Sequence, residues 1–366
     1  MMIPGLDVCP PSEYEADVAL ELKSFTGTFC IPKSKIYGGC RRIVEFEKKS
    51  MLKGTTSWVY RKCLDVRKNI EVCVKKSKSA DKNNIEKDLA ILRREIQIVR
   101  LLKDQNVMEF YEPAVGETLE NVYLIFECCD LFLSDLIEQK VDALFHKAVV
   151  KNIMMQTFRA LDYIHKHHIV HRDLNPKNLM FRKDGILKLA NFENARELDN
   201  PDMKLESTCK NYHAPELILK AATHGTAVDI WAAGCLICEL LLRESNIFCG
   251  NTYELIYQNI INILGVPNNN LWPGYSDLPG LKQMEITNAH SYNCLNIFFK
   301  RSYPQSTETI EFLKKVFIYD PSKRITAEKC LQHPFFLEIP SGCPQKEMSK
   351  VLNEILQKRK AISKTQ

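Results

Sequence analysis

Four side chains have types and spacings that suit the transfer of a phosphoryl group to a hydroxyl. Lys75 lies in "VCVKK", which has the pattern of a strand, and Glu95 follows twenty residues later in a helical run. Asp173 and Asn178 stand five residues apart in "HRDLNPKNL", which has the pattern of a loop. Such a reaction needs a lysine on the phosphates, a carboxylate that orients the attacking hydroxyl, and oxygen ligands for a metal ion. Each residue alone is a weak signal, but their order and spacing together are specific.

Further candidate metal ligands follow in "ILKLANFENARELDN", which begins at Ile186 and has the pattern of a strand that runs into a loop. Asn191 would offer one neutral oxygen, whereas a hard cation such as Mg²⁺ prefers carboxylates. Glu193 restores a carboxylate two residues on. It could act as a substitute ligand or repel the phosphates, and its offset position favours repulsion. We interpret Asn178, Asn191 and Glu193 as the metal-binding positions.

The composition is that of an ordinary globular protein, and 366 residues suffice for one large two-lobed domain. The net charge of +5 is spread over basic residues that are interleaved with acidic ones, so we expect no nucleic-acid partner. The N-terminus has no basic segment followed by an apolar run. The longest apolar run, 227–242, carries two acidic residues and is short for a membrane span, so we expect no membrane association.

Cysteine usage points to a reducing compartment. Fourteen cysteines are scattered without a regular framework, which favours free thiols and an intracellular protein of the nucleus, the cytoplasm or both. The pair Cys235 and Cys238 lies inside the apolar run and lacks a second pair, so we do not interpret it as a zinc site.

The chain divides by pattern into four parts. Residues 1–43 lack sustained periodicity and are interpreted as an N-terminal extension. Residues 44–127 show short strand patterns around one helical run, and residues 128–340 are mainly helical, which predicts an α+β fold. Residues 341–366 form a basic, amphipathic tail. The tail could be a nuclear address, but a solvated helix end is the simpler interpretation.

These motifs resemble the protein kinase family, and within it the cyclin-dependent kinases, from about residue 38 to residue 340. The motif "HAPELIL", the helix start "AVDIWAAGC" and the ending "YDPSKRITAEKCLQHPFF" carry the resemblance, with Arg324 as the expected partner of Glu216. The insert "LGVPNNNLWPGYSDLP" is similar to that of cyclin-dependent kinases, and both ends of the domain resemble the PITSLRE branch and its sister kinase. The resemblance implies a bilobal protein kinase fold, with a small β-rich N-lobe and a larger, mainly helical C-lobe.

The resemblance also implies roles for individual residues. Asp173 would be the catalytic base, and Asn175 would stand where the family has a lysine that meets the transferring phosphate. Phe126 would be the gatekeeper beside the adenine of ATP. The residues expected to bind the nucleotide are Met51, Leu52, Gly54, Val59, Cys73, Lys75, Glu95, Glu127, Cys129 and Met180.

Several departures from the family pattern predict a weak or absent activity. The glycine-rich turn "MLKGTTSWV" keeps only Gly54, which weakens the grip on phosphates. Asn175 lacks the charge of the usual lysine, and Asn191 replaces the aspartate that binds Mg²⁺. Three interpretations stay open: an impaired Ser/Thr kinase that uses ATP and Mg²⁺, a working enzyme with neutral drift, and a pseudokinase that binds a cyclin or a partner kinase. In the last, Asp173 and the Lys75–Glu95 pair would be structural.

Regulatory positions are altered as well. The resemblance implies that Arg94, Arg172 and Arg196 gather around a phosphorylated threonine, but Lys204 stands at that position. A nearby carboxylate or a phosphate on Ser207 or Thr208 could replace it. Cys209 stands where the family has a threonine that positions the substrate. The cyclin-contacting motif reads "LAILRRE" and keeps only Arg94 and Glu95 of the nearest branch, so a cyclin is a possible partner beside the protein substrate.

Overall fold

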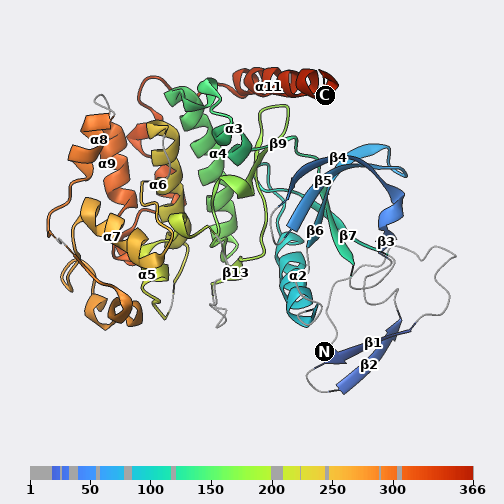
Figure 1. Cartoon of the computed structure of the whole chain (residues 1–366), viewed down its shortest axis with the longest axis horizontal. Coiled ribbons are helices and arrows are strands. Elements are labelled where there is room, and N and C mark those ends of the chain that lie inside the picture. Colours follow the sequence, from blue (N-terminus) through green and yellow to red (C-terminus); the bar gives the residue numbers. More distant parts are fainter. Residues whose placement is uncertain are drawn as a thin grey trace. The chain divides into compact units, whose positions relative to one another are not determined.

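The described residues of the computed structural model form two compact units (Figure 1). One contains residues up to Ile96 together with Glu109–Cys128, and the other contains Gln97–Met108 and the residues from Cys129 onward. The described residues are 19–24, 27–32, 40–54, 58–77, 85–116, 121–198, 209–222, 224–243, 247–287, 290–302 and 307–365.

The first unit is built on a six-stranded sheet with the strand order β3-β7-β8-β6-β5-β4. Its alternating apolar residues bury Phe46, Val72 and Val74 on one face, as a half-buried sheet requires. β5 and β6 form a hairpin whose turn uses Asn69 at φ 51°, a left-handed conformation that asparagine tolerates. The strands are β3 (Arg41–Arg42), β4 (Phe46–Gly54), β5 (Trp58–Asp65), β6 (Ile70–Ser77), β7 (Phe110–Val115) and β8 (Val122–Glu127).

The predicted helical run forms α2 (Ile85–Val99), but the helix ends before the apolar pattern does. The pattern continues to residue 104, whereas the chain turns after Val99. Further along, Met108 N donates to Leu189 O at 2.9 Å. The backbone here bonds to a segment distant in the sequence and does not continue the helix. Within the predicted extension, β1 (Ala19–Ser24) and β2 (Gly27–Pro32) pair as antiparallel strands, which the sequence pattern did not indicate.

Arg41 ties the start of the sheet to the hairpin of β5 and β6. Its guanidinium makes two hydrogen bonds to the Asp65 carboxylate, at 2.6 and 2.8 Å, and lies over the Phe46 ring. Glu45 and Glu112 also pair with it, at 3.0 and 3.2 Å. The hydrogen bonds from Arg41 lower the pKa of Asp65 to about 2. The six-stranded sheet therefore includes Arg41 and Arg42 as its first strand along the chain.

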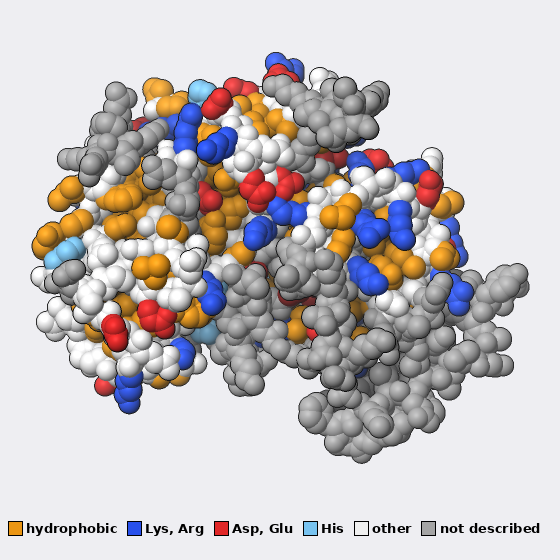
Figure 2. Space-filling model, in the orientation of Figure 1, with side chains coloured by type: hydrophobic (Ala, Val, Ile, Leu, Met, Phe, Trp, Pro, Cys, Tyr) orange, Lys and Arg blue, Asp and Glu red, His pale blue; other side chains and the backbone are white. Residues whose placement is uncertain are grey.

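The second unit is mainly helical around the buried helix α6. The bidentate ion pair of Arg324 with Glu216, at 2.7 and 3.0 Å, is confirmed and fully buried. No helix within the described ranges is long and apolar enough to cross a membrane. On the face shown in Figure 2, basic side chains lie among acidic and apolar ones. The helices are α3 (Leu133–Glu138), α4 (Lys147–Lys166), α5 (Pro215–Ile218), α6 (Ala227–Leu242), α7 (Tyr253–Leu264), α8 (Leu295–Ser302), α9 (Thr307–Val316), α10 (Ala327–Leu331) and α11 (Gln345–Thr365).

Short strands hold the loops of the second unit in place. One three-stranded sheet has the order β12-β11-β9, and a separate pair joins β10 to β13. The loop that carries Asp173 runs between β10 and β11, so both of its ends are fixed by strand pairing. The strands are β9 (Leu131–Phe132), β10 (Ile169–Val170), β11 (Leu179–Phe181), β12 (Leu187–Leu189) and β13 (Arg196–Glu197).

The C-terminal helix α11 is docked, which corrects the interpretation of the tail as a solvated helix end. Met348 and Leu352 are fully buried on its inner face. Ser349 Oγ and Asn353 Nδ2 donate to Lys183 O in the turn between β11 and β12, at 2.8 and 3.2 Å. The i, i+4 spacing of the two buried residues places them on one face, which is the amphipathic pattern that the sequence shows.

Replacing Asp65 by Asn should lower the free energy of unfolding by about 2 kcal/mol at neutral pH, since one pKa unit corresponds to about 1.4 kcal/mol. The folded-state pKa is depressed, so this contribution is present above the ordinary value of 3.8 and is lost as pH falls through about 2. Melting temperatures of the two proteins should therefore converge in acid. Glu47→Gln, which removes an exposed partner of Lys49, is the control and should change little. A pH-independent gap would contradict the assignment.

Replacing Leu352 by Ala should cost about 3 kcal/mol of stability, because it leaves a cavity under α11. The matched control is Lys350→Ala on the exposed face of the same helix, which should stay within about 0.5 kcal/mol. Urea unfolding measures both. Equal effects of the two substitutions would show that α11 is not docked in solution.

Candidate functional site

Lys75 and Glu95 form a buried ion pair in the first unit. Lys75 lies on β6, which pairs with β5 and β8 on either side, and Glu95 lies on α2. The Lys75 Nζ atom is 2.7 Å from both carboxylate oxygens, and each side chain is 1% exposed. The structure thus brings together the two residues that the sequence pattern paired. The two hydrogen bonds fix the position of the Lys75 ammonium group beside α2.

The other nucleotide-binding candidates of the first unit lie on its strands. Met51, Leu52 and Gly54 are on β4, and Gly54 pairs in register with Val59 on β5. Cys73 on β6 is opposite the predicted gatekeeper Phe126 on β8, and both are buried. Glu127 ends β8, and its carboxylate accepts a hydrogen bond from Glu109 N at 2.7 Å. In the second unit, Cys129 is buried and Met180 lies on β11.

Three amide side chains surround the Asp173 carboxylate in the second unit. Asn175 Nδ2 donates to Asp173 Oδ1 at 3.0 Å, and Asn178 Nδ2 donates to Oδ2 at 3.0 Å. Asn194 Nδ2 adds a third bond to Oδ2 at 3.3 Å. The sequence predicted Asn175 and Asn178 but missed Asn194, because nothing in its spacing distinguishes it from a loop asparagine. The arrangement fixes the direction in which the carboxylate points.

Asn191 continues this chain of amides. It is buried and holds φ 63°, a left-handed conformation that asparagine adopts at low cost. A carboxylate only accepts hydrogen bonds, so Asn178 must present its NH₂ to Asp173 and its oxygen to the other side. There Asn191 Nδ2 donates to Asn178 Oδ1 at 3.2 Å. Glu193 is partly buried, and its backbone carbonyl accepts a bond from Arg196 Nη1 at 3.4 Å.

Asp229 at the start of α6 anchors the loop that carries Asp173. Its carboxylate accepts hydrogen bonds from His171 N at 2.9 Å, Arg172 N at 2.8 Å and the His165 ring at 2.8 Å. Burial alone would raise the pKa of Asp229, but these bonds lower it below the ordinary value. Arg172 holds φ 66°, so the backbone turns sharply just before Asp173.

The predicted arginine cluster is described only in part. Arg172 and Arg196 belong to the second unit and are buried, and Arg94 lies on α2. Arg196 Nη1 donates to Ala195 O at 2.9 Å. Lys204, Ser207 and Thr208 lie outside the described residues, so the ligand of the cluster stays a prediction.

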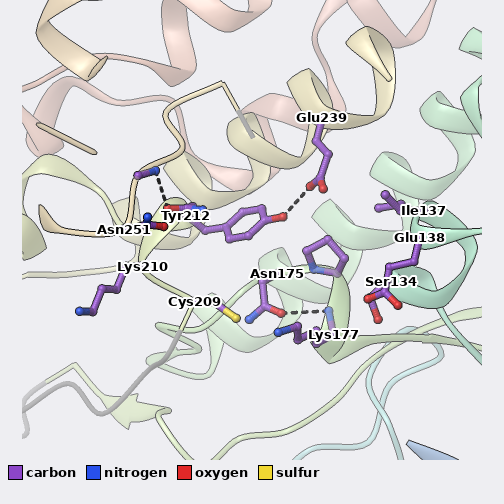
Figure 3. Close-up of a pocket in the computed structure, with 13 residues that line it drawn as sticks. Ser134, Ile137, Glu138, Asn175, Lys177, Cys209, Lys210, Tyr212, Glu239 and Asn251 are labelled. Atoms are coloured by element: carbon purple, nitrogen blue, oxygen red, sulfur yellow. Dashed lines mark hydrogen bonds between the residues drawn. The ribbon is translucent and has the colours of Figure 1, made fainter. Parts of the chain in front are cut away.

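A pocket of about 440 Å³ opens beside the same loop (Figure 3). Asn175 and Lys177 form one wall, and Tyr212 donates a hydrogen bond to Glu239 at its floor. Burial raises the pKa of the Glu239 carboxyl, although the bond from Tyr212 acts against it. Cys209 also lines this pocket. No sequence pattern predicted this pocket, although Cys209 was expected at a substrate-positioning site.

A buried lysine–glutamate pair on a small sheet, and an aspartate loop anchored to a buried helix, are the working parts of a protein kinase. Residues 46–336 match the family described as "Protein kinase domain", and the chain belongs to this family.

Its relatives lie among the cyclin-dependent kinases. The chain is 35% identical over 321 residues to cyclin-dependent kinase 10 of Bos taurus, and this covers 87% of the chain and 86% of the relative. It is 32% identical to cyclin-dependent kinase 11A of Homo sapiens, over 82% of the chain and 38% of that protein. The crystal structure of the yeast RNA Pol II CTD kinase CTDK-1 complex matches with a TM-score of 0.71 and 28% identity, over 82% of this chain and 95% of that one. The predicted family, group and kinase fold are confirmed.

Replacing Glu95 by Gln should cost about 3 kcal/mol or more of stability, because it leaves the Lys75 ammonium buried without its counter-charge. The matched control removes both charges: Lys75→Met combined with Glu95→Leu should recover most of this loss. Thermal unfolding of the three proteins gives the answer. If Glu95→Gln alone is as stable as the wild type, the Lys75–Glu95 pair is exposed to solvent and not buried.

Proposed function

We propose that this chain is a protein serine/threonine kinase of the cyclin-dependent type whose phosphoryl transfer is slow. Membership of the family supports the reaction, in which protein kinases use ATP with Mg²⁺. The Lys75–Glu95 pair supports nucleotide binding, because the family uses such a pair to hold phosphates. The amides in the loop of Asp173 support the low rate.

The observation that carries the low rate is the bond from Asn191 Nδ2 to Asn178 Oδ1. Mg²⁺ takes oxygen ligands at about 2.0–2.1 Å and is usually held by one or two carboxylates. Here Asn178 Oδ1 already accepts an N–H from Asn191. The side chain of Asn191 is a neutral amide, and its NH₂ points toward Asn178. Residues 191 and 178 therefore fit the cation poorly. Glu193 is the one carboxylate among the predicted ligands, and we propose that it repels the phosphates rather than holding the metal.

The chain's own residues define the rest of the proposed reaction. Asp173 would orient the substrate hydroxyl and take its proton as the new oxygen–phosphorus bond forms. The three amides around its carboxylate would keep it in one orientation. Lys75 would neutralise phosphate charge, whereas Asn175 could only donate a hydrogen bond where a lysine would add a charge.

The three amides that bond the Asp173 carboxylate also favour a second candidate function. In this alternative the chain is a pseudokinase that acts as a binding protein. A carboxylate satisfied by three side chains can serve to hold its loop without any catalysis. In this alternative the chain would present α2 or its helical unit to a cyclin or another kinase. A cyclin partner is suggested by the names of its relatives. The described cysteines are free thiols, which supports an intracellular role in the nucleus or cytoplasm.

Replacing Asn191 by Asp should raise the rate of phosphoryl transfer by on the order of a hundredfold, because it restores an anionic metal ligand worth roughly 3 kcal/mol. The assay measures kcat on a protein substrate, with Mg²⁺ and with candidate cyclins present and absent. Asn194→Asp adds the same charge beside Asp173 but not at the metal position, so it should not gain activity.

Asp173→Ala in each background separates the two candidates. If the wild type shows turnover and Asp173→Ala abolishes it, the hypothesis of a binding protein without catalysis is wrong. No turnover in either the wild type or Asn191→Asp would defeat the kinase. Thermal shifts with ATP add a direct measure of binding: stabilisation that does not depend on Mg²⁺ would support the weakened metal site.

A further inference from the structure

The pocket beside the Asp173 loop lies close to the proposed chemistry. Asn175 links the two, because its Nδ2 atom contacts Asp173 and its Oδ1 atom accepts a bond from Lys177 N at 2.9 Å. An extended peptide advances about 3.3 Å per residue. A side chain that enters this pocket would therefore belong to a residue within about three positions of the acceptor hydroxyl.

Two lysines supply the positive charge of the pocket. Lys177 and Lys210 are both exposed and come from different segments of the second unit. Within the ranges that the structure describes, neither ammonium forms an ion pair with a carboxylate. Lys210 Nζ instead lies 5.1 Å from the centre of the Tyr253 ring. Both ammonium groups are thus available to an anionic group that enters from solvent.

The pocket's two carboxylates are placed differently. Glu239 lies at the floor, is 9% exposed and accepts the hydroxyl hydrogen of Tyr212. Glu138 lies on α3 and is exposed, and Figure 3 shows it across the pocket from Lys210. A ligand that enters from outside therefore meets Lys210 before it reaches Glu239. The exposed charges around the pocket are therefore two ammonium groups and the Glu138 carboxylate, which leaves a net positive charge at its mouth.

The volume of the pocket also suits a side chain with its flanking backbone. At about 440 Å³ it falls within the range of about 300–1,000 Å³ that ligand pockets occupy. Ile137 and Pro176 give it apolar surface, and Asn211 and Asn251 give it polar surface. Asn211 Oδ1 accepts a bond from Gly250 N at 3.1 Å, which leaves its NH₂ as a donor.

We propose that this pocket selects protein substrates that carry an acidic side chain within about three residues of the acceptor hydroxyl, and that Lys177 and Lys210 are the residues that recognise it. This inference rests on the proposed kinase function, because it names the substrate class of that reaction. The partner chemistry is a carboxylate, and a phosphate on a serine would satisfy the same donors.

Binding of labelled peptides tests the proposal without requiring turnover. Three peptides share one serine-containing scaffold and differ only in carrying Glu, Gln or Lys at the flanking positions. Fluorescence anisotropy with the full chain should show the Glu peptide binding about fivefold more tightly than the Gln peptide, since an exposed ion pair contributes up to about a factor of five. A phosphoserine peptide should bind at least as well as the Glu peptide.

Charge reversal identifies the residues. Lys177→Glu combined with Lys210→Glu should invert the preference, so that the Lys peptide binds about fivefold more tightly than the Glu peptide. Both lysines are exposed, so the melting temperature should not change. The control is Lys346→Glu, an exposed lysine of α11 outside the pocket that makes the same kind of charge change. It should keep the preference for the Glu peptide.

The outcomes separate this proposal from the kinase function. Equal binding of all three peptides, or a wild-type preference for the Lys peptide, would overturn the pocket assignment whatever the activity. A Glu preference that the charge-reversed variant retains would overturn the role of the two lysines. If the chain shows no turnover but binds the Glu peptide through Lys177 and Lys210, the acidic site stands and the kinase function fails. With turnover, the charge-reversed variant should raise the KM for the peptide and leave kcat unchanged.

Discussion

The Asp229 carboxylate is the contact on which the site of the second unit depends. It sits at the start of the most buried helix, α6, and takes hydrogen bonds from two backbone N–H groups and one imidazole. An anion in such a position is stable only because these donors replace the water it has lost. The two backbone donors belong to the residues immediately before Asp173. The buried helix therefore fixes the place of the reactive loop, and the strand pairs at its ends limit its movement.

From this fixed loop, the amide network extends outward without adding any charge. Asp173 is the one formal charge in the chain of side chains that runs through Asn175, Asn178, Asn194 and Asn191. Within this network Asn175 and Asn178 each donate and accept a hydrogen bond, so their amides are satisfied without any ion. A site that must gather a cation and three phosphates needs uncompensated charge instead. The arrangement thus fixes the conformation of the loop but offers little charge to bind a metal ion or stabilise phosphates.

Much of this could be predicted from the sequence, and the reasons differ by element. The long apolar run predicted α6, and the spacing of Lys75 and Glu95 predicted an ion pair, because both signals are local patterns or fixed family distances. Asn194 was not predicted, because its contact with Asp173 depends on how the loop that carries it folds back. The burial of α11 also escaped, since an amphipathic pattern shows that a face is apolar but not whether a surface is there to receive it. The pocket combines residues from five separate segments, and no pattern along the sequence records that they meet.

The docked helix α11 and the anchor of Arg41 both lie outside residues 46–336, the stretch that matches the protein kinase domain. A fragment cut at those two limits would strip the guanidinium from Asp65. It would also uncover the apolar surface beneath Met348. The folded region is thus longer than the stretch that matches the protein kinase domain. Truncations placed at the limits of that domain match would then expose apolar surface, and the resulting aggregation could be mistaken for a loss of activity.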